Sequence, residues 1–183
     1  CWAAIHASGG TQLVLGENRA VLRDSYYANY APLRAEFLPV VQKYCDFIVR
    51  YGELTLENTG VDISRTASDG INEDVRFTGG GCVFSTDAQA DTVWTILREE
   101  KHRLSLHLVN LRGNDDHWNA PKAQPVLTEH ILLHLRLDRS VTGIYAASPD
   151  GDSLAPESLL FTWQDTPQGR IYTAELPPLA YWM

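Results

Sequence analysis

Three histidines in the second half of the sequence have a spacing that could serve metal binding. His130 and His134 are four residues apart in a run typical of a β-strand, so their side chains would share one face of a sheet. His107, in another such run, could lie across from them. A zinc site needs three or four converging ligands, and this spacing does not require the three to converge. We interpret them as partly exposed strand residues and expect no metal site.

The tripeptide Asp150-Gly151-Asp152 resembles part of a calcium-binding loop. It lacks the further spaced oxygen ligands and the distal glutamate that provides bidentate coordination in such loops. Because Pro149 precedes it, the stretch is better interpreted as a turn. The sequence therefore predicts neither a metal nor a cofactor.

Four residues near the amino end are candidates for contact with a small polar ligand: Gly9, Gly10, Gln12 and Glu17. A glycine pair after a strand lets the backbone approach a ligand closely, although a turn that needs positive φ explains the pair equally well. Gln12 and Glu17 could hydrogen-bond a hydroxyl group, and the alternative is that both are solvated loop residues. The two readings stay open on the residues alone.

Aromatic side chains offer another kind of binding surface, because a ring face packs against C–H groups. The tyrosines of the loop at 25–30 lead into a helix, which favours a structural role over ligand contact. Trp94 and Trp163 lie within apolar strand patterns and are expected in the core, whereas Trp118, among polar neighbours, is the most exposed candidate.

Composition narrows the classes of partner. With 183 residues, 44% hydrophobic and 21% charged, the chain can bury an ordinary globular core. The net charge of −8 and the absence of Lys/Arg clusters argue against nucleic acid. No apolar run approaches the roughly 20 residues of a membrane span. Cys1, Cys45 and Cys82 are too few for a disulfide framework, and Cys45 is expected to be a packed thiol on the buried side of a helix.

The elements that must position these residues begin with a unit at 1–56. The apolar run 2–8 stops at Gly9-Gly10, which suits a strand buried on both faces, as in parallel sheets. A short helical turn is predicted at 32–37, and apolar residues three or four apart predict a helix at 38–52. Strand, loop and helix together indicate a βα unit. Residues 57–90, rich in glycine and poor in apolar anchors, are interpreted as a connector with a short strand at 75–77.

The remainder, 91–183, is predicted to be an antiparallel β-sandwich, which makes the fold class mainly β. Turn residues separate strand-length runs at 93–99, 103–111, 130–137, 141–148, 158–164 and 170–176. A last strand at 179–183 should close the sandwich. Leu179 and Tyr181 are expected on one face and Ala180 and Trp182 on the other, with Trp182 in a structural role.

Several stretches occur in an order that suggests a family: AIHASGGTQLVLGE, SYYANY, KYCDFIVRYGELT, VWTILREEKHRLSLHLVNL, DDHWN and ELPPLAYWM. Together they resemble the carboxy-terminal part of glycoside hydrolase family 66, the dextranases and cycloisomaltooligosaccharide glucanotransferases. The resemblance covers nearly the whole chain and is weakest between 57 and 90. It implies a catalytic (β/α)8 barrel, flanked by β domains, that cleaves α-1,6-glucosidic links with retention.

On this resemblance, 2–8 is the last barrel strand, 38–52 is the last barrel helix, and the sandwich is an accessory domain that packs on the upstream barrel. The family's catalytic Asp and Glu lie upstream, so no residue here is assigned a catalytic role. The implied partner is an α-1,6-glucan or isomaltooligosaccharide bound through the parent barrel, and the implied location is extracellular or at the cell surface.

The physics of retention agrees that the segment is inactive alone. Retaining glycosidases need two carboxyl groups about 5–5.5 Å apart, and Glu17 is the one carboxylate that follows the predicted barrel strand. We therefore expect the segment to complete and stabilise the barrel. Two alternatives stay open, a carbohydrate-binding β-sandwich module and a non-enzymatic interaction domain.

Overall fold

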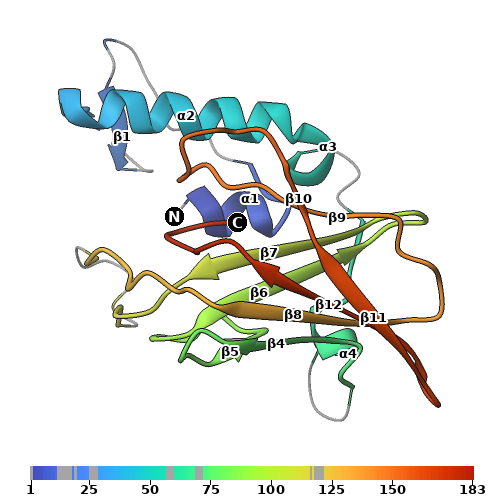
Figure 1. Ribbon diagram of the computed structural model, residues 1–183. Helices are drawn as coiled ribbons and strands as arrows, with labels where there is room; N and C mark the ends of the chain where they lie inside the picture. The colour runs from blue at the N-terminus through green and yellow to red at the C-terminus, as the bar shows by residue number, and fades with distance from the viewer. Residues whose placement is uncertain are drawn as a thin grey trace. The chain divides into compact units, whose positions relative to one another are not determined.

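The computed structural model describes residues 2–11, 18, 20–24, 29–56, 60–68, 72–115, 117 and 122–183. The chain divides into two compact units, Cys1–Asn58 and Thr59–Met183, which are described separately. The described residues of the first unit form helices and one β-hairpin, and those of the second form mainly strands (Figure 1).

The strand predicted over residues 2–8 is wrong. These residues form the helix α1 (Trp2–Ala7), which buries Ala3, His6 and Ala7 at the spacing of one helical face. The Gly9 amide donates to the carbonyl of His6 (3.0 Å) and the Gly10 amide to that of Ile5 (2.8 Å), which is the hydrogen-bond pattern of a Schellman cap. Periodicity cannot separate a short apolar run that is a strand from one that is a buried helix.

The predicted helix over 38–52 is confirmed as α2 (Leu38–Arg50), preceded by the 3-10 turn η2 (Ala35–Phe37) at the predicted place. Pro39 lies in the first turn of α2, where its missing N–H removes no helical hydrogen bond. The helix α3 (Gly52–Thr55) follows directly. Cys45 is exposed on α2, so the expectation of a packed thiol is wrong.

The hairpin of the first unit joins β1 (Ala20–Asp24) to the antiparallel β2 (Asn29–Pro32). The register shifts between Leu22 and Asp24, where a bulge or irregularity interrupts the ladder. The residues between the strand predicted at 2–8 and the turn predicted at 32–37 were expected to form a loop, so this pair of strands was not predicted.

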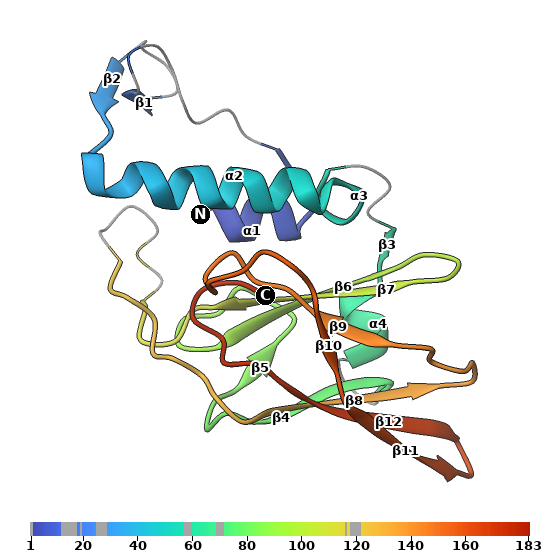
Figure 2. The same cartoon turned by 45° about the horizontal axis from the view of Figure 1, so that its top comes forward.

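One sheet of the second unit has the strand order β11-β12-β8-β4, and every neighbouring pair is antiparallel. The four strands lie side by side as one layer (Figure 2). Each of the four overlaps a strand predicted from the sequence. Their bounds are β4 (Val75–Gly79), β8 (Ile131–Leu137), β11 (Phe161–Thr166) and β12 (Gly169–Leu176).

The other sheet is built around β6 (Val93–Glu99), which confirms the strand predicted at 93–99. The antiparallel strand β7 (Leu104–Asn110) runs along one side of it. Antiparallel β3 (Val61–Asp62) and parallel β5 (Phe84–Ser85) also pair with β6. A separate ribbon joins β9 (Ile144–Ala146) to β10 (Glu157–Leu159).

Residues 60–90 are not a connector. They supply β3, the helix α4 (Ser64–Ser68), β4 and β5 to the second unit, whose first residue is Thr59 and not the predicted 91. Val75 and Phe77 alternate with exposed Arg76 on β4 and enter the core, so the short strand predicted at 75–77 is correct. Two apolar side chains are enough to hold β4 in the sheet because β8 supplies its backbone hydrogen-bond partners.

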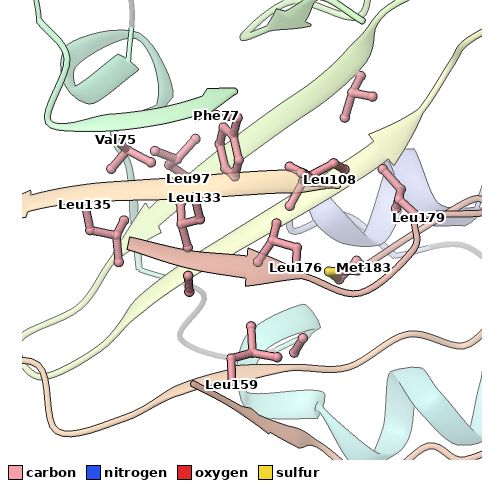
Figure 3. Packing of buried hydrophobic residues seen from close by; sticks show 14 of the residues in the cluster. Val75, Phe77, Leu97, Leu108, Leu133, Leu135, Leu159, Leu176, Leu179 and Met183 are labelled. Atoms are coloured by element: carbon pink, nitrogen blue, oxygen red, sulfur yellow. The ribbon is translucent and has the colours of Figure 1, made fainter. Parts of the chain in front are cut away.

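The core of the second unit lies between the two sheets, which is the arrangement of a β-sandwich. One sheet contributes Leu133 and Tyr172, and the facing sheet contributes Leu97 and Leu108. Figure 3 shows the side chains of Val75, Phe77, Leu133 and Leu135 gathered between the strands. We call the sheet β11-β12-β8-β4 the β8 sheet. The face that packs on the core is shielded from water, and the opposite, outer face carries polar side chains.

The chain end is buried, as predicted, but without regular alternation. Leu179, Trp182 and Met183 are buried, whereas Tyr181 is 42% exposed although it was expected to share a face with Leu179. The segment bends at 180–181 and pairs through single bridges, Leu179 with Thr128 and Trp182 with Val109. The bend breaks the two-residue period that the prediction assumed.

Candidate functional site

Of the four predicted binding residues, the structure describes Gly9 and Gly10, and ligand contact stays a prediction for all four. Gly9 adopts a φ of 77° at the end of α1, as a turn with positive φ requires. A Cβ on Gly10 would lie 3.2 Å from the Ile5 carbonyl oxygen, so close backbone contact accounts for that residue. Gln12 and Glu17 lie outside the described residues.

The aromatic predictions also divide. Trp94 is half-buried and donates its Nε1 proton to the Thr86 carbonyl at 3.1 Å. Trp163, expected in the core, is 54% exposed, and the Arg170 guanidinium lies 4.0 Å over its ring. This prediction failed because β11 is the edge strand of its sheet. Trp118 is outside the described residues.

The three histidines occupy three different environments. His130 precedes β8 with a φ of 57° and contacts Glu175 at 3.1 Å, whereas His134 lies within β8. His107 is buried on β7, in the other sheet, so it does not lie across from the other two. Burial, helped by the positive charge of Arg98, lowers the pKa of His107 to about 4. Within the described part of the chain, no group of three or more His, Cys, Asp or Glu side chains could hold a metal ion.

The outer face of the β8 sheet carries a polar groove of about 450 Å³, which crosses all four strands. Most of its lining side chains can form hydrogen bonds, which makes it a candidate binding site. The lining residues are Glu73, Arg76, His134, Arg136, Thr162, Trp163, Gln164, Ile171 and Thr173.

His134 lines this groove and is held between two threonines. Its Nε2 is 2.9 Å from the Thr78 hydroxyl, and its Nδ1 is 3.2 Å from that of Thr173. Burial lowers the pKa of His134, and the charge of nearby Arg76 lowers it further. The imidazole is therefore held neutral near neutral pH, with one ring nitrogen as donor and the other as acceptor.

Arg136 is held at one side of the groove by an ion pair in which two of its nitrogens donate to one oxygen of Asp74. Its Nε and Nη2 donate to Asp74 Oδ1 at 3.0 and 2.8 Å, and its backbone N–H donates to the Asp74 carbonyl. Of the groove residues, only His134 and Trp163 were singled out from the sequence, and Trp163 was expected in the core. The alternation of His134 and Arg136 with leucines in HILLHLRL was the signal that could have found the face.

Fold and groove define a mainly β unit with antiparallel sheets and a polar outer face, joined to a helical unit. The whole chain, residues 1–183, matches the model of glycosyl hydrolase family 66, and the chain belongs to that family. None of the helices formed by the described residues is long and apolar enough to cross a bilayer.

Relatives within the family cover the chain from end to end. Two cycloisomaltooligosaccharide glucanotransferases of Niallia circulans are 31% and 29% identical to it over 98% of its length. A crystal structure of a Paenibacillus sp. cycloisomaltooligosaccharide glucanotransferase complexed with cycloisomaltoheptaose is also similar, with a TM-score of 0.83 and 30% identity over 98% of the chain. The chain spans only 18% of the curated relatives and 25% of that structure.

Proposed function

We propose that this chain is the carboxy-terminal part of an α-1,6-glucan-active retaining glycoside hydrolase or transglycosylase. The observation that supports this most is the family match over all 183 residues, together with relatives named for glucan transfer. The chain corresponds to less than a fifth of those relatives. The proposal therefore concerns the longer protein of which this segment would be a part.

In this proposal residues 1–56 belong to the end of the catalytic barrel, although residues 2–7 are helical. The second unit is an accessory β-sandwich that stabilises the barrel by packing on it. The catalytic Asp and Glu belong to upstream barrel strands, and Gln12 and Glu17 remain predicted contacts of the substrate loop. A substrate as large as dextran places the enzyme outside the cell or at its surface.

The chemistry of a retaining glycosidase explains why the proposal gives catalysis to the upstream barrel and a stabilising role to this segment. One carboxylate attacks the anomeric carbon while a carboxylic acid about 5–5.5 Å away protonates the leaving oxygen. Hydrolysis and transglycosylation differ in whether water or a sugar hydroxyl then attacks the glycosyl-enzyme intermediate. The segment proposed here contributes to the stability of that site and supplies neither carboxyl group.

The test uses the longer protein and the 183-residue chain side by side with dextran. We expect the longer protein to release isomaltooligosaccharides or cyclic products, detected by chromatography and mass spectrometry. The 183-residue chain should release none at the same molar concentration. A longer protein inactive on dextran would refute the substrate class, and dextran cleavage by the chain alone would refute the upstream location of the catalytic pair.

A further inference from the structure

The outer groove of the β8 sheet is a candidate binding site on the second unit. One row of side chains crosses the four strands as direct neighbours in the ladders: Arg76, His134, Thr173 and Thr162. A second row, formed by Arg136, Ile171 and Gln164, runs parallel to it one pleat away. Four strands spaced about 4.8 Å apart give a polar track about 14 Å wide.

Part of the hydrogen-bonding capacity in this track is unused. Arg76 and Gln164 are both exposed, and neither side chain has a hydrogen-bond partner among the residues that the structure describes. His134 is already oriented by Thr78 and Thr173, and Arg136 by Asp74. A ligand would therefore meet two fixed polar groups and two free ones, so little side-chain ordering would oppose binding.

The charge balance in the groove selects the class of ligand. Arg136 is neutralised by Asp74, and the remaining cation, Arg76, shares the groove with the carboxylate of Glu73. The formal charges cancel, so the groove offers little electrostatic attraction to an anion such as phosphate. It offers equally little to a cation. The groove is complementary to an uncharged ligand with many hydroxyl groups.

Planar side chains strengthen that match. Guanidinium, amide and imidazole groups each present fixed donors or acceptors, and the carboxamide of Gln164 presents both kinds side by side. Neighbouring hydroxyls of a sugar ring can engage such groups in pairs. Trp163 borders the groove, but its ladder partner Tyr172 is a core residue, so strand alternation turns the indole to the opposite face. Recognition would rest on hydrogen bonds and not on stacking.

We propose that this groove binds a short run of glucose units of an uncharged α-1,6-linked glucan. The linkage rests on the proposed function, whereas the uncharged, hydroxyl-rich class rests on the groove itself. A second glucan site in the same chain as a catalytic barrel would retain the polymer between catalytic events, because rebinding becomes intramolecular.

The test is calorimetric titration of the 183-residue chain with linear isomaltoheptaose, repeated with maltoheptaose and with inorganic phosphate. We expect saturable binding of isomaltoheptaose, weaker binding of maltoheptaose and none of phosphate. Arg76→Ala and Gln164→Ala should each weaken isomaltoheptaose binding about fivefold to tenfold, as expected for the loss of one hydrogen bond to a ligand. Amide chemical-shift changes should map to β4, β8, β11 and β12.

Arg65→Ala is the matched control, since Arg65 on α4 is exposed and pairs with Asp87 outside the groove. Its binding should equal that of the unaltered chain. Unaltered binding in both Arg76→Ala and Gln164→Ala, tighter binding of phosphate, or no binding of isomaltoheptaose overturns the inference. If the longer protein still converts dextran, only this inference has failed. Binding by the chain together with an inactive longer protein would instead overturn the proposed function.

Discussion

At the scale of single residues, His107 combines deep burial with a titratable ring. It is 6% exposed, and its Nε2 has no hydrogen-bond partner among the described residues. Its ring lies 6.1 Å from the Trp182 ring, and Arg98 opposes its protonation. Burial thus holds the imidazole neutral in the folded chain, whereas the unfolded chain binds a proton near the ordinary pKa of 6.5.

This difference predicts a loss of stability in acid. Because the folded pKa, about 4, is lower than the unfolded value of 6.5, the unfolded chain binds more protons between these values and the free energy of unfolding falls as pH decreases. From pH 7 to pH 5 the contribution of His107 is about 2 kcal/mol. His107→Phe should remove that part of the decline, measured by urea unfolding at both pH values. An unchanged decline, or an NMR titration midpoint of His107 near 6.5, would contradict the assignment.

At the scale of elements, residues 179–183 are held by side-chain hydrogen bonds in place of the regular backbone hydrogen bonds of a strand. Asp150 Oδ2 accepts hydrogen bonds from the backbone N–H groups of Tyr181 and Trp182, both at 2.9 Å. The buried Asn110 donates through Nδ2 to the carbonyls of Leu179 and Ala180, at 3.2 and 2.9 Å. The stretch interpreted as a turn rather than a calcium loop therefore also caps the end of the chain.

Asp150→Ala should destabilise the second unit by about 1–3 kcal/mol, because two backbone donors near the buried Trp182 lose their acceptor. Thermal unfolding followed by circular dichroism should show a midpoint lower by several degrees. Asp152→Ala is the matched control, since Asp152 is exposed two residues further along, and its midpoint should be unchanged. Equal midpoints for the two variants would show that Asp150 does not hold the chain end.

Elements with a clear period were predictable from sequence, and elements that depend on distant partners were not. The period of α2 and the alternation within β6, β8 and β12 place their elements within a few residues. α1 was missed because a run of six residues carries no decisive period, and its glycine cap resembles a strand-ending turn. Of the groove, His134 was noticed, but Arg76 and Gln164 could not be placed beside it without the strand order.

At the scale of the whole molecule, the partition at 58/59 changes which part should fold by itself. The boundary expected at residue 91 would remove β4 and leave β8 as an unpaired edge in the core sheet. It would also remove Val75 and Phe77, whose burial contributes roughly 1.5–3 kcal/mol each. Residues 60–90 are thus part of the cooperative structure of the second unit.

We expect a 59–183 fragment to unfold in a single cooperative thermal transition and to remain monomeric in sedimentation. A 91–183 fragment should lack that transition and associate, because β8 would expose backbone donors and acceptors and the core would lose one wall. Phe77→Ala in the 59–183 fragment removes a core side chain of β4 but keeps the strand, so it separates the effect of the side chain from that of the whole strand. It should cost about 3–5 kcal/mol while leaving a folded, monomeric protein. If both fragments melt at the same temperature, β4 is dispensable, and the independently folding part begins at residue 91 after all.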